Sequence, residues 1–467
     1  MSSRSKIFSA MAAAGLVLAG PALAADGDAD ARIRELEKKL ERSLQMIEAL
    51  QTKVQQMQPQ AAMPAASSEQ AAKIDALEKQ VAQLGSGLAS RGSADDGVPL
   101  HGFADVGLRR SGEDNSVYGK GKKGFNVGSF DMYLTPNLGG RVKALIEMNT
   151  EVDQGGTVNV DLERLQAGYA FSDALTTWVG RFHTPYGYWN TAFHHGAQIQ
   201  TAVTRPRFLG FEDQGGILPA HTTGFWATGT FDSDAAKFGY DAYFGNAPRV
   251  LAGDGTKSPL QPAQNNVTGT LDMKQAGWGT SQVSAGFNAW FSPKSLSALR
   301  LGVHGLRANV DIEQSSDVGS GLQGLTRLNM FGGYGTFIDD NWEILGEYYR
   351  FKNTNVTVVA TDLSQDMTDH TSSAWYTQVG YNIGQFTPYG RVEKASLSQA
   401  DNYFLSQLSG RSYDKAVVGL RYDLNPKSAV KVELNRTHRR DLVSDANGTP
   451  APDNKFSEAY VQFAVRF

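Results

Sequence analysis

The sequence predicts an all-β transmembrane protein, a closed antiparallel barrel of sixteen strands preceded by an N-terminal α-helical coiled coil. Three observations predict this fold: the hydrophobic period changes from about 3.5 to 2 near Pro99, short and long connections alternate after that point, and no run of 18 apolar residues follows residue 24. The 467 residues include no cysteine and carry a net charge of −4, which excludes disulfides and argues against nucleic acid as a partner.

Residues 1–24 have the pattern of a cleaved bacterial export signal. Arg4 and Lys6 precede a short apolar run, and Ala22-Leu23-Ala24 supplies the small residues of a cleavage site before Ala25. A short membrane anchor is the alternative, and the shortness of the run together with the cleavage site disfavours it. We therefore expect the mature chain to begin at Ala25.

Residues 25–84 are predicted to form a coiled-coil segment, interrupted by a Pro/Ala/Ser break at 58–68 and followed by a Gly/Ser linker at 85–98. Apolar residues recur on both sides of that break at alternate spacings of three and four, interrupted only by Ser43 where an apolar residue is due: Ile33, Leu36, Leu40, Ile47, Leu50, Val54, Met57, then Ile74, Leu77, Val81 and Leu84. A single amphipathic helix packed on a core is the alternative. Isoleucine at a with leucine at d favours a two-stranded coil by the packing rule alone.

Residues 99–467 are predicted to form the barrel, because apolar and polar side chains alternate along segments of about ten residues. In one such segment Val430, Val432 and Leu434 alternate with Lys431 and Glu433. The final segment, FSEAYVQFAVRF at 456–467, has the same alternation and ends on Phe467. We expect this segment to close the barrel, with its odd-numbered side chains toward lipid and its even-numbered ones toward the lumen.

The connections between these segments are of two kinds that alternate along the chain. Short turns are expected at 135–140, 172–175, 232–235, 292–295, 339–341, 384–385 and 425–428. Long polar loops are expected at 111–122, 152–157, 184–218, 248–278, 311–322, 354–369, 399–411 and 441–454. Seven turns and eight loops give sixteen strands. Barrels of the bacterial outer membrane sort their connections in this way, with tight turns on the periplasmic side, whereas a soluble β-sandwich has no reason to do so.

Aromatic residues near the predicted strand ends suit the girdles that such barrels place at the two membrane interfaces. They are Tyr169, Phe171, Trp178, Trp342, Trp375, Tyr381 and Tyr422. Each of them taken alone could equally be ordinary packing. The expected surroundings of the barrel are outer-membrane lipid and lipopolysaccharide, with the N-terminal segment in the periplasm.

Four segments carry a resemblance to a known family: the terminal strand, VGLRYDLNPKSAVKVELN at 418–435, TPYGRVEKA at 387–395 and WVGRFHTPYG at 178–187. They resemble outer-membrane porins, in particular the phosphate-selective porin O/P superfamily and the coiled-coil-bearing DcaP-like porins. The resemblance implies a homotrimer of sixteen-stranded barrels, each narrowed by an inward-folded third external loop, and a coiled coil that follows the trimer. It also implies passive diffusion of small hydrophilic solutes, with anions such as dicarboxylates or phosphate preferred.

The segment from Thr184 to Leu218 occupies the position of that third loop. Its candidate constriction residues are His194, His195, Arg205, Arg207, Glu212 and Asp213. We assign Arg205 and Arg207 to the narrowest point, facing the two acidic residues, because fixed charge on an inward loop sets the field that a solute crosses. The alternative is that both arginines pin the loop to the wall through ion pairs. Phosphate-selective relatives gather lysines at the constriction, and this segment has none, which favours dicarboxylates over phosphate.

Alternation directs further charged side chains toward the lumen. The cations are Arg141, Lys143, Arg164, Arg181, Arg300, Arg391, Arg421 and Lys431, and the acidic counterparts are Glu147, Glu347, Asp423 and Glu433. A ladder of guanidinium groups favours anions, because each planar fork pairs with a carboxylate or a phosphate. The alternative is a set of mutual ion pairs that only stiffen the wall.

Enzymatic and metal-binding functions receive little support. The adjacent His194 and His195 lack the partners of a metal site, so we expect no metal and no cofactor. No catalytic motif stands out, although a hydrolase assembled from distant Ser, His and Asp residues stays open. The competing class is a structural barrel that tethers the outer membrane to the cell wall, with peptidoglycan as the partner of its coiled coil.

Overall fold

The computed structural model describes most of the chain after residue 99. The described residues are 100–112, 123–152, 158–193, 196–211, 216–250, 271–272, 282–312, 324–358, 365–405, 407, 410–440 and 454–467. The predicted signal peptide, coiled-coil segment and linker lie outside them and stay predictions. Over the described ranges, no helix has the length and apolar character needed to cross a membrane.

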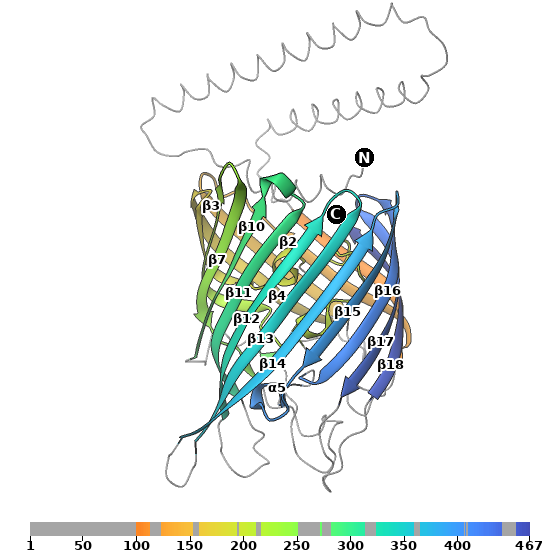
Figure 1. The fold of residues 1–467 in the computed structure, drawn as a ribbon. Coiled ribbons are helices and arrows are strands. Elements are labelled where there is room, and N and C mark those ends of the chain that lie inside the picture. Colours follow the sequence, from red (N-terminus) through yellow and green to blue (C-terminus); the bar gives the residue numbers. More distant parts are fainter. Residues whose placement is uncertain are drawn as a thin grey trace, which may run out of the picture. The chain divides into compact units, whose positions relative to one another are not determined.

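Sixteen long strands form one closed antiparallel barrel (Figure 1). They are β1 (Leu100–Ser111), β2 (Lys123–Leu134), β3 (Val142–Val152), β4 (Val158–Ser172), β5 (Leu175–His183), β6 (His221–Asp232), β7 (Ala236–Asn246), β10 (Val283–Pro293), β11 (Leu299–Ile312), β12 (Gly324–Ile338), β13 (Trp342–Val358), β14 (Gln365–Tyr381), β15 (Phe386–Ser396), β16 (Ser412–Asn425), β17 (Ser428–Arg440) and β18 (Asn454–Arg466). Two further short strands of the same sheet, β8 (Arg249–Val250) and β9 (Leu271–Asp272), lie between β7 and β10 in the sequence. The predicted sixteen-stranded barrel is confirmed.

The last strand closes the barrel, as its alternation predicts. β18 pairs with β1 in a continuous register that runs from Phe103 opposite Arg466 to Ser111 opposite Glu458. Two backbone hydrogen bonds extend this register, from the Gly102 N–H to the Phe467 carbonyl at 3.2 Å and from the Phe467 N–H to the Gly102 carbonyl at 3.0 Å. Closure gives each of the sixteen long strands a neighbour on both sides, which is the condition for placing a sheet in lipid.

The connections alternate between short turns and longer loops, and both kinds fall where the sequence predicts them, with one exception. The predicted loop at 354–369 is wrong in length, because β13 and β14 continue their pairing as far as Val358 opposite Gln365. Thr354 and Asp369 lie opposite each other and join their side chains by a hydrogen bond of 2.7 Å. The polar residues there form a hydrogen-bonded strand pair, so a loop predicted from their polarity alone is longer than the loop in the structure.

The two faces of the barrel wall differ in the way that the alternation predicts. Large apolar side chains are exposed on the outer face; in β18 Val461 is 42% and Phe463 is 40% exposed, whereas Gln462 between them is 9% exposed. The same difference holds on β17, where Val432 and Leu434 are exposed and Glu433 is fully buried. An apolar outer face and a polar inner face are the reverse of a soluble fold and suit a hydrocarbon surround.

Aromatic pairs that are exposed or half-buried lie near the rim that carries the short turns. Trp342 packs against Tyr381 with ring centroids 4.6 Å apart, and the Phe386 and Tyr422 rings are 4.7 Å apart. Trp178 differs from the expected girdle position, because it stacks on Trp226 at 5.9 Å, and Trp226 packs against the buried cluster inside the barrel.

Candidate pore constriction

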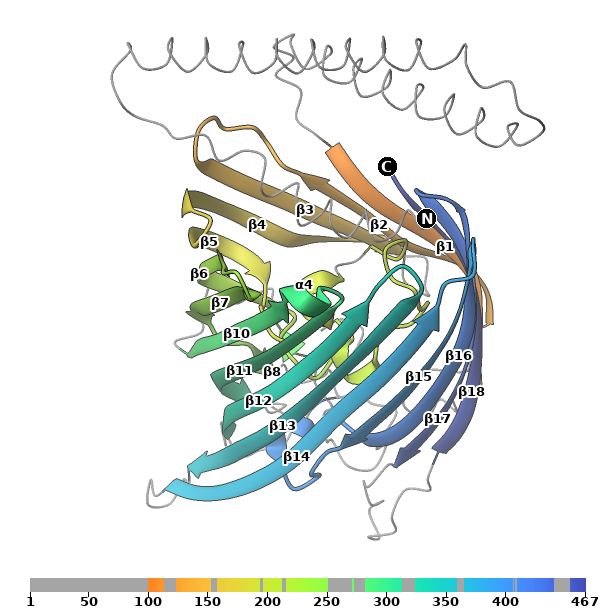
Figure 2. The ribbon, with the colours of Figure 1, turned by 45° about the horizontal axis from the view of Figure 1, so that its top comes forward.

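The segment between β5 and β6 crosses the inside of the barrel. It contains a short helix, α4 (Trp189–Ala192), and a 3-10 turn, η2 (Arg207–Leu209). From its two ends at β5 and β6 the segment reaches side chains on β13, β14, β15, β16 and β17, which lie on the other side of the barrel (Figure 2). A segment that touches all these strands has to lie in the lumen. We call residues 184–220 the inner loop.

The buried carboxylate of Glu347 on β13 holds the start of α4. Its oxygens accept hydrogen bonds from the Tyr188 N–H at 3.0 Å and from the Trp189 N–H at 2.7 Å. The hydroxyls of Tyr349 and Tyr376 donate to the same carboxylate at 2.7 and 2.6 Å. Four donors around one carboxylate compensate for taking its charge out of water.

Gly187 makes this approach feasible. Its φ of 62° lies in the left-handed region that favours glycine. A Cβ atom at this position would meet a Glu347 oxygen and the Tyr349 hydroxyl, each at 2.2 Å. The glycine of the YGYWN stretch therefore lets the chain turn directly above the carboxylate that binds the next two N–H groups.

A second buried carboxylate, Glu433 on β17, binds the middle of the inner loop. It accepts hydrogen bonds from the Val203 N–H at 2.9 Å and the Thr204 N–H at 3.2 Å, and from the hydroxyl of Thr204. The Tyr389 hydroxyl on β15 donates to it at 2.9 Å. The arrangement repeats the one at Glu347, with two backbone donors from the loop and a tyrosine from the wall.

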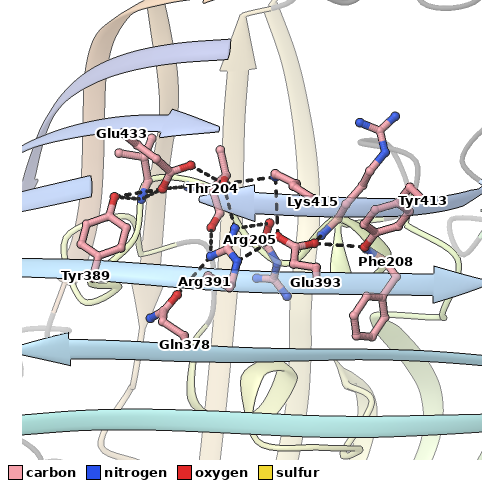
Figure 3. Close-up of polar contacts among 12 residues, drawn as sticks. Thr204, Arg205, Phe208, Gln378, Tyr389, Arg391, Glu393, Tyr413, Lys415 and Glu433 are labelled. Carbon is pink, nitrogen blue, oxygen red and sulfur yellow. Dashed lines mark hydrogen bonds and ion pairs between the residues drawn. The ribbon is translucent and has the colours of Figure 1, made fainter. Parts of the chain in front are cut away.

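A third carboxylate, Glu393 on β15, lies in a buried network of mixed charge (Figure 3). It accepts the Arg207 N–H at 2.8 Å and the Tyr413 hydroxyl at 3.0 Å. Arg391 donates to it through Nε at 2.8 Å, and the Lys415 ammonium lies 3.7 Å away. The Thr204 hydroxyl links Arg391 with the carboxylate of Glu433, so two cations and two carboxylates belong to this network.

Wall cations bind carbonyl groups of the inner loop. Arg391 donates to the Thr204 carbonyl at 2.8 Å and to the Arg205 carbonyl at 3.2 Å. Arg421 on β16 donates to the Gln198 and Gln200 carbonyls at 2.6 and 2.7 Å. Lys431 on β17 donates to the carbonyls of Ala197 and Ala202. These bonds satisfy loop carbonyls that have no strand partner.

Aromatic side chains fill the space between the inner loop and the wall from β11 to β16. The loop contributes Tyr186, Tyr188, Trp189, Phe193 and Phe208, and the wall contributes Tyr334, Tyr349, Tyr376 and Tyr413. The Phe208 ring lies 5.2 Å from Tyr349, and the Trp189 ring lies 5.6 Å from Tyr376. Burial raises the pKa of Tyr188 to about 12, so this loop phenol stays neutral at physiological pH.

Of the predicted constriction residues, the structure describes two. The Arg205 guanidinium donates to the Leu209 carbonyl at 2.9 Å and the Phe193 carbonyl at 3.2 Å, and lies 3.9 Å above the Phe211 ring. The Arg207 guanidinium lies 5.8 Å from the ring of Phe456 on β18. His194, His195, Glu212 and Asp213 lie outside the described residues.

The eight predicted wall cations have different surroundings. Four of them bond carboxylates or loop carbonyls inside the barrel: Arg164 with Glu147, Arg391 with Glu393, Arg421 with Asp423, and Lys431 with the inner loop. Arg141 donates to the Phe171 carbonyl at the turn rim at 3.1 Å. Arg181 donates to the Glu163 carbonyl at 3.1 Å and pairs in register with Leu165, an exposed residue. Arg300 stacks on Trp290, and Lys143 is half-buried on β3.

The sequence reasoning missed a second inward loop, residues 397–411, which contains α5 (Asn402–Leu405). Phe404 packs edge-on against Phe351 at 5.2 Å, and the Tyr403 hydroxyl donates to the Ile217 carbonyl of the inner loop. The Asp401 carboxylate accepts from the Asn353 side chain at 2.8 Å, and burial raises its pKa. The apolar NYFL stretch within a polar loop was the available signal. Glu343, Tyr389, Glu393, Tyr413 and Lys415 were also missed, although alternation directs them inward.

Two histidines mark the ends of the inner loop. His183 and His221 pair in register, and their rings lie 4.6 Å apart. The His221 Nε2 lies 2.9 Å from a Glu163 oxygen, and the His183 Nε2 lies 3.8 Å from a Glu147 oxygen. No group of His, Asp and Glu side chains in the described part of the chain has the geometry of a metal site.

No protein-family model matches the chain, and no curated protein sequence matches it. An anion-selective porin from Comamonas acidovorans has a similar structure, with 13% identity, a TM-score of 0.49, and coverage of 79% of this chain and 99% of that chain. OmpT, an outer-membrane protein of Vibrio cholerae, in its trimer form, gives 10% identity, a TM-score of 0.47 and coverage of 79% and 99%. Salmonella typhi OmpF in complex with daunomycin gives 12% identity, a TM-score of 0.43, and coverage of 79% of this chain and 97% of that chain. Similarity at this level does not establish function.

Proposed function

We propose that the protein is a porin of the bacterial outer membrane that forms a water-filled channel for passive diffusion of small hydrophilic solutes. The single observation that carries the proposal is the closed sixteen-stranded barrel with an apolar outer face and a charged, hydrogen-bonded loop fixed across its inside. Such a loop narrows a lumen without closing the barrel wall. Its anchoring to three wall carboxylates keeps the narrowing in one place.

We further propose that the channel prefers anions, with dicarboxylates favoured over phosphate. Arg205 and Arg207 bring two fixed positive charges onto the inner loop. In a narrow lumen these charges act through a lower effective dielectric than bulk water, so they bias permeation by about 1 kcal/mol. The proposal includes a homotrimer, which the sequence resemblance implies, and a periplasmic coiled coil, which the spacing of apolar residues predicts.

A structural barrel that tethers the membrane to the cell wall is the second candidate. The buried aromatic cluster between the inner loop and the wall favours it, because side chains with exposures of a few per cent leave no water path among themselves. In this function the lumen is plugged and the N-terminal segment carries the activity.

Conductance of the purified protein in a planar bilayer separates the two candidates. The porin function predicts steady ion-conducting steps. Under a salt gradient it also predicts a reversal potential whose sign shows that anions permeate more readily than cations. The double variant Arg205→Ala, Arg207→Ala should shift that potential toward zero. Absence of steps from protein that migrates as a heat-modifiable folded barrel would overturn the porin function and favour the tether.

A further inference from the structure

Arg300 on β11 is a lumenal cation with no hydrogen bond or ion pair to any residue that the structure describes. It pairs in register with Thr336, which is buried on the inner face, and its own side chain is half-buried. Its guanidinium carbon lies 4.1 Å from the centre of the Trp290 ring and 6.0 Å from that of Tyr188 in the inner loop. Within the described ranges, no carboxylate, carbonyl or hydroxyl is in hydrogen-bond or ion-pair contact with this guanidinium. Arg391 and Arg421, by contrast, each donate to several acceptors.

The stacking fixes the orientation of the group and leaves its donors open. Trp290 lies flat on the wall above Gly239, where a Cβ atom would meet the indole ring at 2.3 Å. Arg300 covers the ring from the lumen side. Stacking uses the face of a guanidinium, whereas its N–H donors point outward from the edge in a planar fork. The fork therefore stays available to a ligand in the lumen.

The carboxylates of Asp241 and Glu347 already accept hydrogen bonds from other donors. Asp241 on β7 accepts from the Trp226 indole N–H at 3.1 Å and from the Asn288 amide at 3.4 Å. Glu347 accepts four hydrogen bonds from the inner loop and from two tyrosines. No described carboxylate thus cancels the charge of Arg300 by direct contact. A half-buried cation in this state attracts a mobile anion more strongly than an exposed or paired one.

We propose that Arg300 is a binding subsite for small carboxylates, located on the turn side of the inner loop. The position follows from the chain, because Arg300 comes just after the short turn that contains η3 (Lys294–Leu296), and Tyr188 directly precedes α4. A carboxylate matches the fork through two parallel N–H···O bonds, which a spherical chloride ion cannot form. The subsite rests on the proposed channel function and gives that channel a preference among anions.

The test compares Arg300→Lys with the wild type in planar bilayers, with chloride on one side and acetate on the other. Lysine keeps the charge but loses the fork, so the acetate-to-chloride permeability ratio should fall about threefold or more, while selectivity for anions over cations persists. Arg307→Lys is the matched control, because Arg307 is an exposed residue on the outer face of the same strand. Trp290→Leu should produce a partial loss, since it removes the surface that orients the guanidinium.

The outcomes distinguish this subsite from the function on which it rests. If Arg300→Lys conducts normally and keeps the wild-type acetate-to-chloride permeability ratio, the carboxylate subsite is overturned and the channel function stands. An equal fall of the acetate-to-chloride permeability ratio in Arg307→Lys also overturns the subsite, because the effect would then follow from replacing any arginine of the strand by lysine. A folded wild-type barrel that gives no conductance overturns both proposals.

Discussion

The attachment of the inner loop to Glu347 can be tested with one pair of matched substitutions. Glu347→Gln changes a carboxylate that accepts four hydrogen bonds, two of them from backbone N–H groups that cannot reverse their direction. In either orientation of the new amide, its NH2 group faces one of these N–H donors. A buried unsatisfied donor costs about 1–3 kcal/mol, and the remaining bonds lose the strengthening that the charge provides. We expect a total loss of about 2–4 kcal/mol in the local stability of the loop.

Glu343→Gln is the control, on the same face of the same strand. Glu343 accepts from the Thr201 hydroxyl at 2.8 Å and from the Gln378 amide at 3.2 Å. A glutamine can accept from Gln378 and donate to the Thr201 hydroxyl, which reverses its role without cost in geometry. We therefore expect a change of about 1 kcal/mol or less, within the range of a single neutral hydrogen bond.

Amide hydrogen exchange of the peptide that contains Tyr188 and Trp189 measures the difference. A loss of 2–4 kcal/mol corresponds to roughly 30- to 1,000-fold faster exchange in Glu347→Gln, because about 1.4 kcal/mol is a factor of ten. Strands of the barrel serve as the internal reference and should be unchanged. Equal exchange rates in the two variants, or a wild-type rate in Glu347→Gln, would show that packing of the aromatic cluster holds the loop without the carboxylate.

Three further predictions address assembly and the second inward loop. Deleting Phe467 should lower the yield of heat-modifiable barrel, because its ring lies over Gly102 and its backbone extends the β1–β18 pairing; wild-type yield would contradict this. Cross-linking of the full-length protein should capture three chains, and a dominant two-chain species would show that the Ile/Leu pattern of the coiled coil decides the assembly. Because burial raises the pKa of Asp401, the folded form of residues 397–405 is most stable below the ordinary pKa of a carboxyl group and loses stability as pH rises through the raised pKa. Protease sensitivity of this loop should therefore increase with pH in the wild type, and Asp401→Asn should remove that dependence.

The number and direction of the strands could be predicted because they depend on local patterns. A period of two fixes which side chains share a face, and turn residues such as those at 339–341 and 425–428 mark where the chain reverses. Each of these features can be recognised within about ten residues, without knowledge of distant contacts. The error at 354–369 arose because β13 and β14 continue their pairing through polar residues.

The partners of the inner loop could not be predicted, since they depend on contacts between distant parts of the chain. Glu343 and Glu347 are both inward glutamates of β13, yet one binds side chains alone and the other binds the first N–H groups of α4. Their difference lies in where Gly187 turns the loop, which alternation does not encode. The same reason explains why the sequence could not predict the contacts of Arg205, whose guanidinium donates to carbonyls of its own loop.

The charge available in the lumen is therefore smaller than the sequence suggests, and the inner loop is the cause. Arg391, Arg421 and Lys431 are inward cations, but each is buried against loop carbonyls from Ala197 to Arg205. The loop narrows the barrel and withdraws these three charges from a passing solute at the same time. Arg300 keeps its fork open because Tyr188 presents an aromatic ring to it and no carbonyl. Release of the loop would thus widen the lumen and return three cations to it, so the width of the lumen and its exposed charge are coupled through one segment.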